Sequence, residues 1–152
     1  MATYFFDSSA LTKFYHQELG SAKVQSIFSE PGRRILISRL TSVEMQSVFA
    51  GKVRTHAITL AEASKLRRAF LSDIRHRSFE VLAVTGPHYR RAERLIELHG
   101  VSQRLRTLDA LQLAVALGLR QRALLDYFVA SDKALCTIAA TEGLPVVNAE
   151  LP

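Results

Sequence analysis

Short runs of β-forming apolar residues alternate with helical patterns along the whole chain, and this alternation limits the possible folds more than any other feature. The helical patterns are punctuated by residues that stop helices, such as Pro31-Gly32, Gly100 and Gly143. Strands that alternate with helices favour a mostly parallel sheet with helices over its faces. We therefore predict an α/β fold with strands at 3–6, 35–37, 79–84, 127–129 and 145–147.

Helices are expected between these strands. Thr59 and Glu62 form a capping-box pattern that opens one of them. Helical patterns cover 8–16, 21–29, 40–54, 59–77, 86–99, 107–119 and 131–141. With 152 residues, the chain is long enough for one sizeable core, so we expect 1–152 to form a single domain.

The sequence gives no sign of export or of membrane insertion. No apolar run is long enough to cross a bilayer, and the first residues lack the basic segment of a signal peptide. Cys136 is the only cysteine, so an internal disulfide is impossible, and we expect a small buried apolar residue there. A cytoplasmic protein without a membrane partner is the expectation.

Four isolated acids, Asp7, Glu44, Asp109 and Asp132, stand at or near predicted helix starts. Each has a simple structural explanation as a helix cap or first-turn acid, and Thr41 with Glu44 matches a capping box. Asp109, however, is the only charge in a helical pattern that is apolar on nearly every side. A lone buried carboxylate needs a partner or a metal ion.

The chemistry of such a group of acids favours a metal-dependent nuclease. Helix starts beside the carboxyl ends of parallel strands can converge on one crevice. Close carboxylates repel each other by about 4 kcal/mol per pair at an effective dielectric near 20, and hard divalent cations remove that repulsion. The net charge of +6 would in turn attract a polyanion such as RNA.

The motifs that contain these acids resemble the PIN-domain family, and most closely its VapC toxin branch from bacterial toxin–antitoxin pairs. The matching segments are Tyr4 to Leu11 (YFFDSSAL), Ser42 to Glu44 (SVE), Asp109 to Ala114 (DALQLA) and Val129 to Asp132 (VASD). The resemblance implies a three-layer α/β/α sandwich that cleaves RNA with Mg²⁺ or Mn²⁺. It also implies a cognate antitoxin, and we expect a homodimer.

Carried over residue by residue, the resemblance assigns Asp7, Glu44, Asp109 and Asp132 to the catalytic, metal-binding quartet. Ser9 matches a small polar residue that supports the metal site. The chain departs from the family pattern at Ala130, where many relatives have Thr or Ser, and Ser131 is the substitute that we expect.

Basic and apolar positions suggest contacts with partners. Arg104 and Arg106 precede Asp109 in a loop, where they could bind RNA phosphates. Arg90 and Arg94 lie on one helix with two glutamates, so they fit either an RNA path or a solvated face. A strip of apolar residues favours core packing, with a homodimer or antitoxin interface as the alternative: Met45, Val48, Phe49 and Val53.

Two other functions fit parts of the pattern. A metal-dependent phosphatase would use Asp7 as its nucleophile, but haloacid-type enzymes need a second acid two residues later, where this chain has Ser9. A non-catalytic module that binds nucleic acid or a partner protein would gain nothing from four mutually repelling acids. A ribonuclease is therefore the leading hypothesis.

Overall fold

A five-stranded parallel sheet forms the centre of the protein in the computed structural model, which describes residues 1–152. Its order is β3-β2-β1-β4-β5, and every neighbouring pair is parallel. The strands are β1 (Thr3–Phe6), β2 (Arg34–Ser38), β3 (Glu80–Leu82), β4 (Tyr127–Ala130) and β5 (Val146–Asn148). The predicted α/β fold is therefore confirmed, and the sheet is wholly parallel.

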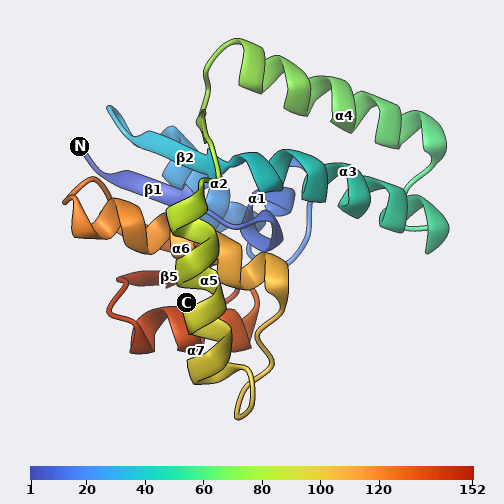
Figure 1. The fold of residues 1–152 in the computed structure, drawn as a ribbon. Helices are drawn as coiled ribbons and strands as arrows, with labels where there is room; N and C mark the ends of the chain where they lie inside the picture. The colour runs from blue at the N-terminus through green and yellow to red at the C-terminus, as the bar shows by residue number, and fades with distance from the viewer.

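Seven helices cover the two faces of this sheet (Figure 1). On one face lie α1 (Ser8–Tyr15), α2 (Ser21–Ser29), α3 (Arg39–Arg54) and α4 (Leu60–Arg75). On the other lie α5 (Gly86–His99), α6 (Thr107–Gln121) and α7 (Lys133–Thr141). The result is the predicted three-layer sandwich. None of these helices is both long and apolar enough to traverse a bilayer.

The central strand β1 contributes to both cores because its side chains alternate across the sheet. Tyr4 and Phe6 belong to the core beneath α1 to α4, whereas Phe5 belongs to the core beneath α5 to α7. Phe5 stacks on Phe128 of β4, with ring centroids 6.0 Å apart. A strand buried on both faces needs an unbroken apolar run, which explains this part of the sequence.

The predicted strand at 79–84 is shorter in the structure. It ends at Leu82, because β3 is an edge strand whose only partner is β2, and Leu82 lies opposite Ser38, the last residue of β2. Ala83 and Val84 therefore have no strand to pair with.

The connections create a topological switch point at the carboxyl ends of β1 and β4. These strands are neighbours, but β1 is followed by α1 on one face of the sheet and β4 by α7 on the other. Ligands of open α/β sheets bind at such a switch point, outside the carboxyl ends of the strands. The residues that follow β1 and β4 are therefore candidates for a functional site.

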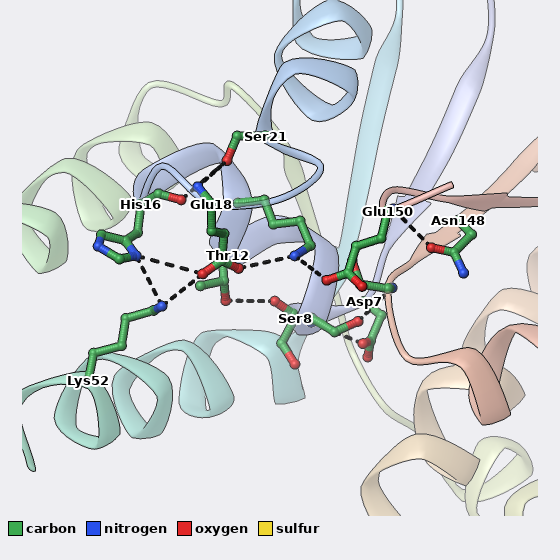
Figure 2. A network of polar contacts seen from close by, with 12 residues as sticks. Asp7, Ser8, Thr12, His16, Glu18, Ser21, Lys52, Asn148 and Glu150 are labelled. Atoms are coloured by element: carbon green, nitrogen blue, oxygen red, sulfur yellow. Dashed lines mark hydrogen bonds and ion pairs between the residues drawn. The ribbon is translucent and has the colours of Figure 1, made fainter. Parts of the chain in front are cut away.

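A buried lysine of α1 binds the carboxyl-terminal segment through Glu150, which Figure 2 shows close to Glu18. Lys13 is only 4% exposed, and its Nζ lies 2.8 Å from Glu150 Oε1 and 3.2 Å from Glu18 Oε1. Glu18 also accepts a hydrogen bond from Lys52 of α3, at 3.0 Å. The network therefore ties α1, α3 and the residues after β5 together.

We predict that Lys13→Met lowers the free energy of unfolding by about 1.5–3 kcal/mol, the usual range for a hydrogen bond to a charged group. Glu18 and Glu150 remain partly exposed, so water can solvate them once the ammonium is removed. Urea unfolding measures the loss. Lys65→Met, on the exposed side of α4, is the matched control and should stay within about 0.5 kcal/mol of the parent. Equal effects of the two changes would contradict a structural role for Lys13.

Candidate functional site

Asp7 directly follows β1 and caps α1. Its Oδ2 accepts a hydrogen bond from the Ser9 N–H at 3.0 Å, and its own N–H donates to the Val129 carbonyl at 2.9 Å. The residue is only 3% exposed, and its buried Oδ1 has no hydrogen-bond partner. Burial raises the pKa of Asp7 above its ordinary value. Capping uses one oxygen and leaves the other buried and unsatisfied, which is unfavourable without a ligand.

Glu44 does not form the expected capping box with Thr41. Helix α3 begins at Arg39 after Ser38, so Glu44 lies in its second turn, too far along the helix to cap it. Instead, Glu44 Oε1 accepts a hydrogen bond from Gln112 Nε2 at 3.0 Å. The pKa of Glu44 is raised to about 7, first by burial and then by the charge of Asp7.

Gln112 is the functional candidate that the sequence reasoning missed. It is fully buried on α6 and forms hydrogen bonds with three side chains of the β2–α3 segment. Its Nε2 also donates to Thr41 Oγ1 at 2.7 Å, and its Oε1 accepts from Ser38 Oγ at 2.6 Å. The signal was present in the sequence: Gln112 is an amide inside a run of apolar residues, and a buried amide needs partners. It holds Glu44 against α6.

Asp109 and Asp132 complete the set of acids. Asp109 lies in the first turn of α6 and is half-buried. Its pKa is raised to about 6 by burial, then by the charges of Asp7 and Asp132, while Arg106 opposes the shift. Asp132 is exposed and caps α7, with its Oδ1 accepting from the Leu135 N–H at 2.8 Å. Asp7 and Asp132 therefore cap α1 and α7, as the simple structural explanation of these acids predicts.

The four acids share one electrostatic neighbourhood without forming a compact cluster. The charge of Asp7 raises the pKa of Glu44 and of Asp109, and the charge of Asp132 raises the pKa of Asp7 and of Asp109. No three His, Cys, Asp or Glu side chains, however, stand close enough together to hold a metal ion directly. The carboxylates are close enough to raise one another's pKa, but three of them are never close enough to bind the same ion. Such a separation is expected for charges that repel each other.

This donor set fits a hydrated divalent cation. Mg²⁺ is commonly bound by only one or two carboxylates and keeps several water molecules, so a preformed cage of ligands is not required. The buried, unpartnered Oδ1 of Asp7 is an oxygen of the kind that Mg²⁺ and Mn²⁺ prefer. A cation nearby would also relieve the repulsion that raises the pKa of Glu44 and Asp109.

Ser9 and Ser131 connect the segments that follow β1 and β4. The Ser131 N–H donates to Ser9 Oγ at 3.0 Å, which fastens the segment after β4 to α1. The Ser131 hydroxyl oxygen is buried and has no hydrogen-bond partner. Ala130 is fully buried in β4, where its carbonyl accepts from the Ala149 N–H.

The basic candidates fall into two groups. Arg104 and Arg106 are exposed in the loop before α6, and Arg106 is close enough to lower the pKa of Asp109. Arg90 and Arg94 lie on α5, and Arg94 shares a hollow with Arg120. Arg120 is about 16 Å along α6 from Asp109 at the usual helical rise, so Arg94 lies far from the acids.

Two structural predictions made from the sequence are confirmed. In the apolar strip on α3, Met45 and Phe49 are buried in the core beneath α1 to α4 and Val53 packs against it, as expected, but Val48 instead lines the surface hollow beside Glu44. Cys136 is buried, and burial raises the pKa of its thiol to about 11.

We predict that the metal-free protein is more stable at pH 5.5 than at pH 7.5. Glu44 and Asp109 have pKa values of about 7 and 6 in the folded state, against ordinary values of 4.5 and 3.8. Between about pH 4.5 and 7 the folded state therefore binds more protons, so stability falls as the pH rises. Urea unfolding in EDTA measures this, and Glu44→Gln should reduce the difference. Greater stability at pH 7.5 would contradict the assignment.

Comparison with known proteins agrees with this architecture. The model of the PIN domain family matches residues 4–140. No curated protein matches the sequence. The structure resembles that of VapC20 from Mycobacterium tuberculosis, described as a Sarcin-Ricin loop cleaving toxin, with a TM-score of 0.67 and 17% identity over 95% of this chain and 98% of the other.

Two further solved structures share the fold. PAE2754 from Pyrobaculum aerophilum has a TM-score of 0.64 and 23% identity, covering 96% of this chain and 84% of its own. VapBC2 from Rickettsia felis, solved with a DNA fragment from its promoter, has a TM-score of 0.66 and 15% identity, covering 96% and 98%. These likenesses support the fold, and the match to the family model over most of the chain shows that this protein belongs to the PIN domain family.

Proposed function

We propose that this protein is a Mg²⁺- or Mn²⁺-dependent endoribonuclease and the toxin of a type II toxin–antitoxin pair. The observation that carries the proposal is Asp7, whose buried Oδ1 has no hydrogen-bond partner and whose charge raises the pKa of Glu44 and of Asp109. Membership of the PIN domain family and the fold shared with proteins described as toxins support the same activity. The expected site of action is the cytoplasm.

Asp7, Glu44, Asp109 and Asp132 would hold a hydrated metal ion, with most of them acting through its bound water molecules. When bound, it would supply positive charge for the phosphodiester and lower the pKa of a bound water. The chain itself provides the positioning. The Ser9 N–H fixes one oxygen of Asp7, and Gln112 fixes one oxygen of Glu44. The second oxygen of Asp7 is left for another contact.

The surface beside Glu44 supports an interaction with a protein partner. A hollow of about 510 Å³ is lined mainly by apolar side chains of α3 and by Leu108. Val43 in this lining is 68% exposed, and Leu108 is 44% exposed. Because an exposed apolar hollow favours a partner that covers it, we propose this area for the cognate antitoxin or for a second copy in a homodimer.

The alternative functions have less support. A phosphatase would need an acid where Ser9 stands, and the Ser9 hydroxyl is already engaged with the Ser131 N–H. A non-catalytic binding module would have no use for the buried, unsatisfied oxygen of Asp7. A measurement of RNA cleavage distinguishes a non-catalytic binding module from a ribonuclease.

Asp109→Asn should abolish RNA cleavage while the protein stays folded. The amide keeps the size of the side chain but removes the charge that would bind the cation. Cleavage of total RNA in Mg²⁺, followed on a gel with EDTA as the blank, measures the loss. In EDTA the variant should be at least as stable as the parent, because a repelling charge has been removed.

Glu97→Gln is the matched control, since Glu97 is exposed on α5 and has no ion-pair partner. It should change neither cleavage nor stability. Mg²⁺ at 100 times its dissociation constant should stabilise the parent and this control by about 2.7 kcal/mol. A folded Asp109→Asn protein that cuts RNA at the parent rate would refute the proposed quartet.

Changing Arg104 and Arg106 together to Ala should weaken RNA binding and flatten its dependence on salt. Both are exposed in the loop before α6, and Arg106 lies close to Asp109. Removing a cation that binds a phosphate lowers the salt slope by about one unit. Binding of a labelled RNA in EDTA across salt concentrations measures the slope. An unchanged slope would place the RNA path elsewhere, for example over Arg90 and Arg94.

A further inference from the structure

A hollow with a polar rim lies between α5 and α6, away from the four acids. It encloses about 440 Å³, a size typical of small-molecule sites. Its polar rim contains Thr85, His88, Arg91, Gln121 and Arg122, and no carboxylate lines it. Gly118, at its centre, is nine residues after Asp109, or about 14 Å along α6, so one phosphate group cannot reach both places.

Gly118 lines this hollow without filling any of it, because it has no side chain. A Cβ at this position would lie 3.4 Å from His88 Nε2 and 3.8 Å from Arg91 Nη1. Arg122 also comes close, because its Nε donates to the Gly118 carbonyl at 3.4 Å. Three nitrogen-bearing side chains from two helices therefore gather over one residue that has no side chain.

The hydrogen bonds in the rim prepare it for an anion. The Thr85 N–H donates to His88 Nδ1 at 3.0 Å, so the neutral imidazole carries its proton on Nε2, the nitrogen that faces Gly118. Arg91 is held by a hydrogen bond to Gln121 Oε1. The atoms that remain available here on His88, Arg91 and Arg122 are donors.

The charge in the hollow is not neutralised by the protein. Neither Arg91 nor Arg122 has a carboxylate within 4.0 Å, whereas Arg34 pairs with Glu80 elsewhere on the surface. Burial, and then the charges of Arg91 and Arg122, lower the pKa of His88. Cations crowded together without a counter-charge favour a bound anion.

We propose that the hollow between α5 and α6 binds the phosphate of a nucleotide, with His88, Arg91 and Arg122 as its donors. Planar guanidinium groups suit phosphate oxygens. The floor of the hollow is apolar, formed by Leu82, Val115 and Leu119, and offers a surface for the base or sugar. The phosphate can come from a free nucleotide or from an RNA strand, since the chemistry is the same.

The test uses the whole protein in EDTA, so that binding is measured without cleavage and independently of the proposed nuclease activity. The His88 ring signals are followed by nuclear magnetic resonance during titration with adenosine monophosphate, inorganic phosphate and a single-stranded hexanucleotide RNA. A saturable shift is expected. Arg91→Ala should weaken binding about tenfold or more, the effect of losing a charge-assisted hydrogen bond.

Two further variants separate a built site from diffuse attraction. Gly118→Leu fills the hollow without changing any charge and should abolish the shift, with folding checked by circular dichroism. Arg68→Ala, on the exposed side of α4, removes the same charge elsewhere and should change affinity less than twofold. Binding of the RNA alone identifies the strand as the source, and binding of the mononucleotide identifies a free ligand; either supports the proposal.

Three results would overturn the proposal. The first is no saturable shift with any of the probes. The second is an equal loss of affinity in Arg91→Ala and Arg68→Ala, which would indicate attraction by net charge alone. The third is tighter binding of a glutamate-rich peptide than of either nucleotide probe, which would identify the hollow as a protein-binding surface.

Discussion

The burial of Asp7 at the end of the central strand is the constraint on which the site depends. Because β1 lies between β2 and β4, the residue that follows it is enclosed by both neighbours and by α1. A carboxylate placed there loses water on all sides, which raises its pKa. The surrounding protein satisfies only one of its oxygens. The folded protein therefore buries this carboxylate and leaves one of its oxygens without a hydrogen-bond partner.

The supports around this group come from distant parts of the sequence. Ser9 joins α1 to the segment after β4, and Gln112 joins α6 to β2 and α3. The bonds of Ser9 with Ser131, and of Gln112 with Ser38 and Thr41, join uncharged groups in buried or half-buried places, where such bonds are well defined. The acids can therefore hold their positions while their charges respond to protons or cations.

The fold could be predicted from the sequence because its signals are local. The apolar run before Asp7 and the Thr59–Glu62 capping box mark elements that the structure contains. The end of β3 could not be predicted, because it depends on where the neighbouring strand stops. The same reason explains Glu44: its pattern with Thr41 suggested a cap, but the true start of α3 is set by its connection to β2.

The candidate site was only partly predictable. The four acids are recognisable as isolated charges in apolar surroundings, but their mutual distances depend on packing between elements that are far apart in the sequence. Gln112 shows the limit most clearly, since its three partners lie about 70 residues away and become neighbours only when α6 packs beside β2. The phosphate site proposed for His88 and Arg91 could not be predicted from the sequence either, because it depends on how these side chains pack over Gly118.

The buried Lys13 has a practical consequence for handling this protein. Its ammonium relies on Glu150, two residues from the chain end, and Lys23 holds the carbonyls of Asn148 and Leu151. An affinity tag fused after Pro152 would disturb the segment whose Glu150 neutralises the buried charge of Lys13. Met1 is 98% exposed and lies outside β1, so a tag at the amino end would leave these contacts undisturbed.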